Sequence, residues 1–321
     1  MIVTVTLNAA LDRTLVAPDF TLGTSRSVEH GLNLGGGKGL NVARALHSLQ
    51  CPVLALGFAG GLTGAQIQRS LEAEGLPHQL TTIRGESRTC TAIVDPARSL
   101  ATEINEPGPP IESDEIAAFL ASFDRAVRTA RLVCLSGSLP AGMPADYYAT
   151  LIAHAREAGV PCFLDSRGAA LRAGIHAGPL LVKPNQHEAA ELFGETLDPF
   201  DSAAVQRALP KPGPAGLAIT LGADGAVLHS PGGSWRAYAP KVQPVDTVGA
   251  GDSFVAGLAA GLVRAADQQD LLDVIAQPDV ARTMLRLATA TAVANTLTIG
   301  AGRCDPADIA RLLELVRVEP L

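Results

Sequence analysis

Short apolar runs alternate with helical patterns along most of the chain. Residues 1–7 alternate β-branched with other residues and predict a first strand. Later apolar runs predict strands at residues 52–56, 131–135, 161–164, 180–182 and 217–220. Helical spacing predicts helices at residues 63–74, 146–158 and 186–193, and helices alone from residue 253 onward. This alternation predicts an α/β fold, in which helices cover a mostly parallel sheet.

Two stretches interrupt this rhythm. Residues 11–34 and 88–107 mix polar and β-branched residues with glycines and show no helical periodicity. We expect them to form a small β-sheet, a lid over the edge of the main sheet where ligands bind in open α/β folds. No repeat or linker divides the chain, so residues 1–321 are expected to form one domain that includes this lid.

Composition narrows the functional classes. Hydrophobic residues make up 47% and charged residues 18%, as in a folded soluble domain. The net charge of -7, without any block of like charges, argues against nucleic acid as a partner. The longest uncharged stretch is broken by proline and glycines, and residues 1–7 do not resemble a signal peptide. With five scattered cysteines, these features predict a cytoplasmic protein that does not enter a membrane.

A glycine-rich segment at residues 246–254, DTVGAGDSF, leads into an apolar helical pattern. Its three central residues, Gly249, Ala250 and Gly251, can turn backbone N–H groups toward an anion at the start of the helix. Asp252 would then lie beside that anion and could accept a proton from an attacking hydroxyl. The alternative is that Asp252 only caps a helix after a glycine turn.

A second glycine-rich segment, residues 35–44, also begins a helix. It is not a phosphate-binding Walker loop, because Gly39 follows Lys38 where serine or threonine would be needed. Gly36 and Gly37 allow a ligand to approach the backbone closely, and Asn41 can both donate to and accept from hydroxyl groups. Sugar recognition fits this segment better than nucleotide recognition. A flexible turn with a solvated lysine is the alternative.

Two further segments follow predicted strands. In residues 183–188, KPNQHE, Asn185 and Glu188 are three positions apart and could hold a hydrated Mg²⁺. The alternative is that these residues only begin an ordinary helix with an acidic first turn. Residues 220–225, TLGADG, predict a hairpin turn between two apolar strands. At the end of a strand, Thr220 and Gly222 could also line a triphosphate or ribose.

Together these four segments resemble the ribokinase-like sugar kinases of the PfkB family over nearly the whole chain. The segments GGGKGLNVA at residues 35–43 and DTVGAGDSF at residues 246–254 are similar to the two signatures of the family. Within it, the segments at residues 6–12, 87–89, 102–109 and 136–140 resemble the branch of 1-phosphofructokinase and tagatose-6-phosphate kinase. The resemblance implies a three-layer α/β/α body with a small β-sheet lid.

The resemblance also implies a role for particular residues in an ATP- and Mg²⁺-dependent phosphotransferase. It places Asp252 as the catalytic base beside Gly249, Ala250 and Gly251. The substrate-binding residues it implies, some on sugar hydroxyls and others near the substrate phosphate, are Asp12, Arg26, Gly36, Gly37, Lys38, Asn41, Arg88 and Ser136. The residues it places beside ATP are Lys183, Asn185, Thr220, Gly222 and Gly225. It assigns Mg²⁺ to Asn185 and Glu188, through water.

Two residues depart from the pattern of the branch. Ala9 stands where a proline is common, which should change only the rigidity of the turn. Arg167 stands where a small residue is usual. It could add positive charge near the phosphates or point to solvent, and we favour solvent.

The expected reaction is phosphorylation of a ketohexose phosphate to a ketohexose 1,6-bisphosphate. A kinase for an unphosphorylated sugar or a nucleoside on the same fold is the nearest alternative, and Arg88 argues against it, because a free sugar needs no permanent cation. A catalytically silent sugar- or nucleotide-binding regulator is the other alternative, and the intact glycine loop with Asp252 argues against it.

The exposed edges and apolar face of the lid predict a homodimer formed through that sheet.

Overall fold

A ten-stranded sheet runs through the body of the protein. The computed structural model describes residues 1–25, 27–28, 30–98, 100–194 and 197–321. Its strand order is β14-β13-β12-β11-β10-β9-β8-β1-β4-β5. Neighbouring strands run parallel from β5 to β11 and antiparallel from β11 to β14. The strands are β1 (Ile2–Thr6), β4 (Val53–Gly60), β5 (His78–Ile83), β8 (Leu132–Ser136), β9 (Cys162–Asp165), β10 (Leu181–Val182), β11 (Gly216–Thr220), β12 (Ala226–Ser230), β13 (Gly233–Tyr238) and β14 (Arg317–Pro320).

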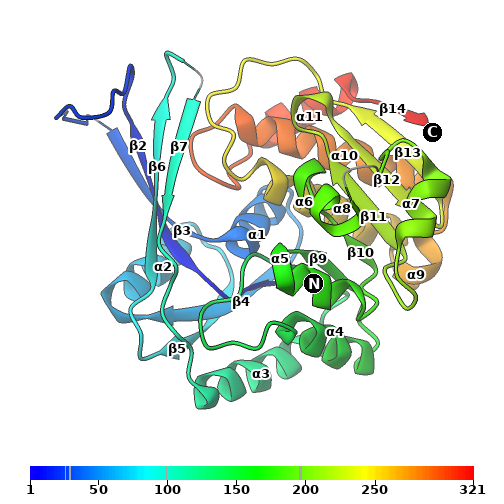
Figure 1. Cartoon of the computed structure of the whole chain (residues 1–321), viewed down its shortest axis with the longest axis horizontal. Coiled ribbons are helices and arrows are strands. Elements are labelled where there is room, and N and C mark those ends of the chain that lie inside the picture. Colours follow the sequence, from blue (N-terminus) through cyan, green and yellow to red (C-terminus); the bar gives the residue numbers. More distant parts are fainter. Residues whose placement is uncertain (26, 29, 99, 195–196) are drawn as a thin grey trace.

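Helices cover both faces of this sheet, which makes the body three layers thick (Figure 1). Consecutive residues of β1 show why its sequence is apolar throughout: Ile2 packs into the core on one face and Val3 into the core on the other. The first core is covered by α1 (Lys38–Ser48), α2 (Gly61–Ala73), α8 (Ala250–Ala266), α9 (Leu271–Val274), α10 (Pro278–Thr296) and α11 (Pro306–Leu315). The second is covered by α3 (Ser113–Val127), α4 (Tyr147–Glu157), α5 (Gly168–Ile175), α6 (Gln186–Phe193) and α7 (Ser202–Ala208).

A four-stranded sheet projects from the body as a lid (Figure 1). Its order is β3-β2-β6-β7, with strands β2 (Ala10–Val16), β3 (His30–Gly36), β6 (Arg88–Asp95) and β7 (Leu100–Asn105). Strand β2 begins four residues after β1 ends, and β3 leads into α1 through Gly37 alone. The lid therefore rises from the carboxyl end of β1, as the sequence predicts.

Most predicted elements are confirmed to within a few residues, but the C-terminal prediction is wrong. The chain does not stay helical after residue 253, because residues 317–320 form β14 at the edge of the sheet, paired with β13. Three of the four residues of β14 are exposed, so the strand is held by backbone pairing and carries no apolar signal. Helix α8 also begins earlier than residue 253, at Ala250. Within the described part of the chain, no helix is long and apolar enough to cross a membrane.

Candidate active site

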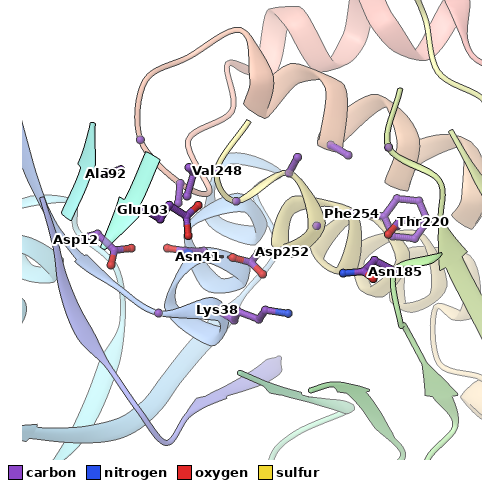
Figure 2. A pocket seen from close by; sticks show the side chains of 18 of the residues that line it. Asp12, Lys38, Asn41, Ala92, Glu103, Asn185, Thr220, Val248, Asp252 and Phe254 are labelled. Carbon is purple, nitrogen blue, oxygen red and sulfur yellow. Dashed lines mark hydrogen bonds between the residues drawn. The ribbon is translucent and has the colours of Figure 1, made fainter. Parts of the chain in front are cut away.

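A cavity of about 970 Å³ lies where the lid meets the carboxyl ends of the body strands. Asp12 of the lid lines one end of it, Asn185 and Thr220 line the opposite end, and Asp252 lies between them (Figure 2). Its volume is within the usual range for small-molecule sites. The predicted residues that line it are Asp12, Gly37, Lys38, Asn41, Arg88, Lys183, Asn185, Thr220, Gly222, Gly225, Gly249, Ala250, Gly251 and Asp252.

The loop before α8 requires glycine. Gly249 has a φ of 82° in the left-handed region, and a Cβ there would lie 2.7 Å from Ala301. Among the described residues, none accepts a hydrogen bond from the backbone N–H of Gly251 or Asp252 at the start of the helix. The helix dipole points its positive end at the same place. This loop therefore offers free donors and a favourable field to an anion in the cavity.

Asp252 is buried in the first turn of α8, with 6% of its surface exposed. One of its carboxylate oxygens accepts a hydrogen bond of 2.9 Å from the side-chain amide of Asn41 on α1. Burial raises the pKa of Asp252 to about 7, with a further rise from Asp165, while Lys38, Asn41 and Lys183 act against it. A carboxylate with such a pKa is a competent proton acceptor near neutral pH.

Two of the four lysines meet one buried carboxylate beside the glycine loop. An oxygen of Asp165 lies 3.0 Å from Nζ of Lys38 and 3.4 Å from Nζ of Lys183. Burial alone would lower the pKa of Lys38, but the charges of Asp165, Asp252 and Glu188 outweigh it and raise the pKa. A Cβ at Gly251 would lie 3.7 Å from Nζ of Lys183. Two lysine side chains thus border the loop.

The sequence predictions did not include Asp165 as a site residue. It is the last residue of β9, only 1% exposed, and its second oxygen is buried without a hydrogen-bond partner in the described structure. The available signal was its position, because an aspartate directly after the apolar run at residues 161–164 stands at the ligand-binding edge of a parallel sheet.

The sugar end predicted from the sequence is built around Asp12 on β2. A Cβ at Gly36 would lie 2.0 Å from a carboxylate oxygen of Asp12, so only glycine at this position of β3 leaves room for the side chain. Burial raises the pKa of Asp12 to about 6, although the nearby charges of Arg44 and Arg88 oppose the rise. Gly36 itself shapes the cavity through Asp12 and does not line it.

Arg88, the first residue of β6, joins the lid to the body. Its guanidinium donates to the carbonyl of Asn8 through Nε at 3.2 Å and Nη2 at 2.9 Å, and to the carbonyl of Glu106 through Nη1 at 3.0 Å. Because a guanidinium has five N–H groups, two remain for a ligand in the cavity that Arg88 lines. Its predicted companion Arg26 lies outside the described residues.

Ser136 and Glu188, also predicted as site residues, do not line the cavity. Ser136 ends β8, is 1% exposed, and its hydroxyl has no partner in the described structure. Glu188 and Asn185 form a capping box at the start of α6, where each side chain accepts from the backbone N–H of the other at 2.8 Å. The helix-start explanation of these two residues is therefore confirmed.

The capping box does not use every oxygen atom of Asn185 and Glu188 that could bind a metal ion. One carboxylate oxygen of Glu188 makes no hydrogen bond within the described structure, and oxygen ligands of this kind suit Mg²⁺. No group of three or more His, Cys, Asp or Glu side chains that could hold a metal was found in the described parts of the chain. The free oxygen of Glu188 therefore fits a Mg²⁺ ion that this pair would hold through water.

The far end of the cavity is formed by the turn between β11 and β12. The predicted hairpin is confirmed: the two strands are antiparallel, and a short 3-10 turn, η1 (Gly222–Asp224), joins them. Thr220, Gly222 and Gly225 line the cavity there.

Comparisons with known proteins show the family to which the chain belongs. The family model described as "pfkB family carbohydrate kinase" matches residues 6–308. The chain belongs to this family. The family that the sequence motifs resemble is therefore confirmed, and its members are phosphotransferases that act on carbohydrates.

Solved structures resemble this PfkB kinase over nearly its whole length. Phosphofructokinase-2 from Escherichia coli in complex with fructose-6-phosphate is 26% identical, covers 98% of both chains and has a TM-score of 0.82. A possible 1-phosphofructokinase from Thermotoga maritima is 24% identical, with 100% and 99% coverage and a TM-score of 0.84. Ribokinase from Arabidopsis thaliana with ribose and ATP is 23% identical, with 98% coverage of both chains and a TM-score of 0.69. The last two show the ribokinase-like fold.

The two residues that depart from the family pattern do not disturb the site of this PfkB kinase. Ala9 is buried between β1 and β2. Arg167 is exposed before α5 and does not line the cavity, which agrees with the interpretation that it points to solvent.

Proposed function

We propose that this kinase transfers the γ-phosphate of ATP to a hydroxyl of a ketohexose phosphate and forms a ketohexose 1,6-bisphosphate. The observation that carries the proposal is the position of Asp252. This buried carboxylate lies at the glycine loop, between an end with Asp12 and Arg88 and an end with Thr220 and Gly222, in one cavity. Fructose 1-phosphate, tagatose 6-phosphate and fructose 6-phosphate are the candidate acceptors.

Asp252 is the general base in this proposal. Its carboxylate takes the proton of the acceptor hydroxyl as that oxygen attacks the γ-phosphorus and the bond from phosphorus to the leaving oxygen of ADP breaks. The amide of Asn41 holds the carboxylate at 2.9 Å. The phosphoryl group faces the free N–H groups of Gly251 and Asp252 and the side chains of Lys38 and Lys183. These groups stabilise its negative charge in the transition state of the transfer. Mg²⁺, held by Asn185 and Glu188 through water, would neutralise part of the triphosphate charge.

The charged groups at the sugar end favour a phosphorylated acceptor. Asp12 has the acceptor oxygens that sugar hydroxyls need, whereas Arg88 keeps two N–H donors for an anion. The two remaining donors lie on separate nitrogens of one planar group, an arrangement that suits the bidentate binding of a phosphate. In a chain of net charge -7, such local cations are needed to draw in a dianion.

An assay of ADP release across ketohexose phosphates and free sugars tests the proposal. We expect kcat/KM for one ketohexose phosphate to exceed that for every free sugar by at least roughly 10-fold, the contribution of one charge-assisted contact. A preference for a free sugar or a nucleoside would show instead that the protein is a kinase for an unphosphorylated acceptor. If the protein binds sugar or nucleotide but shows no turnover with any acceptor, it is the catalytically silent regulator.

We propose further that two copies of the chain pair through their lids. All six residues of β7 are exposed, and Leu100 and Ile104 on this edge strand each expose 60% of their surface. They lie four positions apart and so on one face of the strand. An open strand edge with an apolar face is the kind of surface that proteins cover. A tetrameric inhibited form is known for the Escherichia coli phosphofructokinase-2 that this chain resembles.

A further inference from the structure

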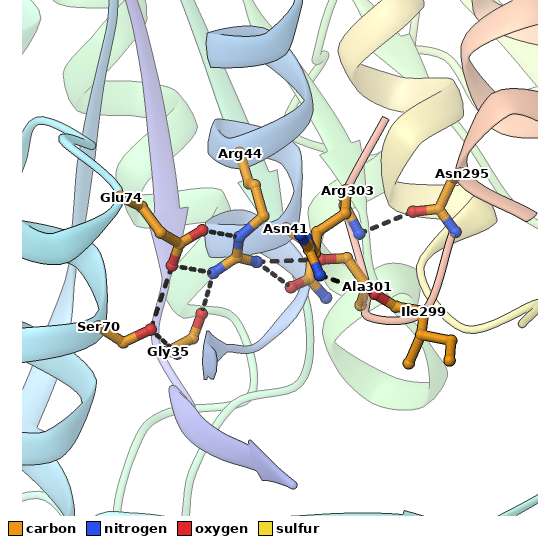
Figure 3. Close-up of polar contacts among 10 residues, drawn as sticks. Gly35, Asn41, Arg44, Ser70, Glu74, Asn295, Ile299, Ala301 and Arg303 are labelled. Atoms are coloured by element: carbon orange, nitrogen blue, oxygen red, sulfur yellow. Dashed lines mark hydrogen bonds and ion pairs between the residues drawn. The ribbon is translucent and has the colours of Figure 1, made fainter. Parts of the chain in front are cut away.

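Arg44 on α1 contacts Asn41, the residue that donates a hydrogen bond to the proposed base, and is buried, with 5% of its side chain exposed (Figure 3). It follows Asn41 by three residues and donates to the side-chain oxygen of Asn41 at 3.2 Å. It also donates to the carbonyl of Gly35 at 2.6 Å and to that of Ala301 at 3.0 Å. One guanidinium thus contacts the glycine-rich turn, Asn41 and the loop after α10.

The contact with Arg44 decides which way the amide of Asn41 points. A guanidinium has N–H donors and no acceptor, so the atom of Asn41 that faces it is the oxygen. The amide NH₂ must then face Asp252, and it donates to that carboxylate at 2.9 Å. A donor at this position stabilises the ionised form of Asp252.

We propose that Arg44 is a positioning residue that locks the Asn41 amide as a donor and thereby keeps Asp252 in its base form. This inference rests on the proposed function, in which Asp252 is the base. Without Arg44, the amide of Asn41 can turn over and accept a hydrogen bond from protonated Asp252. That alternative arrangement stabilises the neutral carboxyl, which cannot accept a proton.

The other charged groups that act on Asp252 come from different elements. They are Lys38 on α1, Asp165 at the end of β9 and Lys183 after β10. Burial already raises the pKa of Asp252 to about 7, so both protonation states are accessible near neutral pH and a change in one hydrogen bond alters their balance. Substitution of Arg44 removes none of these charges.

Glu74, at the end of α2, provides a matched control. Its carboxylate accepts from Nε and Nη2 of Arg44 at 2.5 and 3.0 Å and from the hydroxyl of Ser70 at 3.1 Å. The variant Glu74→Gln removes the ion pair but leaves Arg44 its contacts with Asn41, Gly35 and Ala301. This variant therefore distinguishes a loss of stability from a loss of the contact that fixes the orientation of the Asn41 amide.

The experiment compares Arg44→Met, Arg44→Lys, Glu74→Gln and Arg282→Met, the last an exposed arginine of α10. The carboxyl of Asp252 is titrated by NMR in ligand-free protein with ¹³C-labelled aspartate, and its signal is assigned with Asp252→Asn. We expect Arg44→Met to raise the pKa of Asp252 by about one to two units, because a hydrogen bond to a charged group is lost. Glu74→Gln lowers the melting temperature and leaves this pKa unchanged, and Arg282→Met changes neither.

The kinetic counterpart is the acid limb of kcat/KM against pH, which reports the free enzyme. For Arg44→Met it moves to higher pH, so that activity falls roughly 10-fold near pH 6.5 and approaches the parent near pH 9. If Arg44→Met does not fold, Arg44→Lys carries the test, because an ammonium cannot reach all three segments and shifts the titration in the same direction.

An Asp252 titration within about 0.3 of a unit of the parent, in a folded Arg44 variant with a lowered melting temperature, would overturn the proposal and leave Arg44 a purely structural residue. The NMR titration uses no substrate. A parent enzyme that phosphorylates no sugar would therefore refute the proposed function, while the effect of Arg44 on Asp252 is judged separately.

Discussion

The side-chain amide of Asn41 lies 2.9 Å from a carboxylate oxygen of Asp252, although 211 positions separate the two residues in the chain. The contact joins the first turns of α1 and α8, each of which begins at a glycine-rich loop. Because residues of both helix starts line one cavity, the two glycine motifs form a single site, which in the proposed function spans the sugar and phosphate ends.

The variant Asp252→Asn should lower kcat by about 100-fold to 10,000-fold, because it keeps the shape of the side chain and removes the general base. ATP affinity should stay within a few fold, since the loop N–H groups and lysines are unchanged. Turnover and ATP binding are measured separately, by coupled assay and calorimetry. Turnover within a few fold of the parent would show that another group takes the proton.

The same substitution should stabilise the protein at alkaline pH. The pKa of Asp252 is about 7 in the folded state and 3.8 by its ordinary value, so the folded protein binds this proton more tightly than the unfolded chain. Stability from this group is therefore fully present below pH 4 and is lost as pH rises to about 7. Asp252→Asn removes that loss and should gain roughly 2 to 4 kcal/mol at pH 8, with a smaller gain at pH 5. Denaturant unfolding at the two pH values checks this, and an equal gain at both would contradict it.

The sequence predicted the body well because its signals are local. Alternation of apolar runs and helical spacing located β1, β8, β9 and α6 to within a residue or two. Strand β14 was missed because its residues are mostly exposed and it is defined by its pairing with β13, which no local pattern records.

The site predictions show the same division between local and distant information. Glycine motifs pointed to Asp252 and Asn41, because each motif contains its own functional side chain. The clamp of Asp165 on Lys38 depends on a contact between residues 127 positions apart. The proposed role of Arg44 depends on the contact of Asn41 with Asp252, which is 211 positions away. The capping box of Asn185 and Glu188 was readable from their spacing alone.

Arg88→Ala should raise KM for the sugar phosphate by roughly 10-fold to 150-fold and leave KM for ATP nearly unchanged. The structure adds a second effect, because two hydrogen bonds of Arg88 to the carbonyl of Asn8 tie the lid to the segment that follows β1. A modest drop in melting temperature should accompany the change in KM. Arg98→Ala, in the lid but away from the cavity lining, is the control. Equal changes in both KM values would mark Arg88 as structural only.

Charged substitutions on the exposed edge of the lid should separate the two copies of a dimer. The double variant Leu100→Asp and Ile104→Asp places like charges on β7 and should give a monomer at micromolar concentration by light scattering. Leu62→Asp, on the first turn of α2 with 82% of its surface exposed, is the matched control and should leave the mass unchanged. A parent protein that is already a fully active monomer would refute pairing through the lid.

Glu188→Gln should raise the Mg²⁺ concentration needed for half-maximal activity while leaving the fold intact. Glutamine keeps the hydrogen bond to the backbone N–H of Asn185, because a capping box accepts Glu or Gln at this position, so α6 still begins at Gln186. Only the charge is lost, and a carboxylate is the ligand that binds Mg²⁺ most readily among protein side chains at phosphate sites. We expect a rise of roughly 10-fold or more in the Mg²⁺ requirement, the scale seen when a supporting carboxylate of a metal site is removed.

Glu191→Gln is the matched control for this prediction. Glu191 lies one turn further along α6, half exposed, and its carboxylate pairs with His187. It should leave the Mg²⁺ dependence of the rate unchanged. The melting temperature of each variant shows whether the helix start has been kept. A Glu188→Gln enzyme with parental Mg²⁺ dependence and a parental melting temperature would mean that Glu188 serves the capping box alone and that the ion is held by the phosphates and other groups.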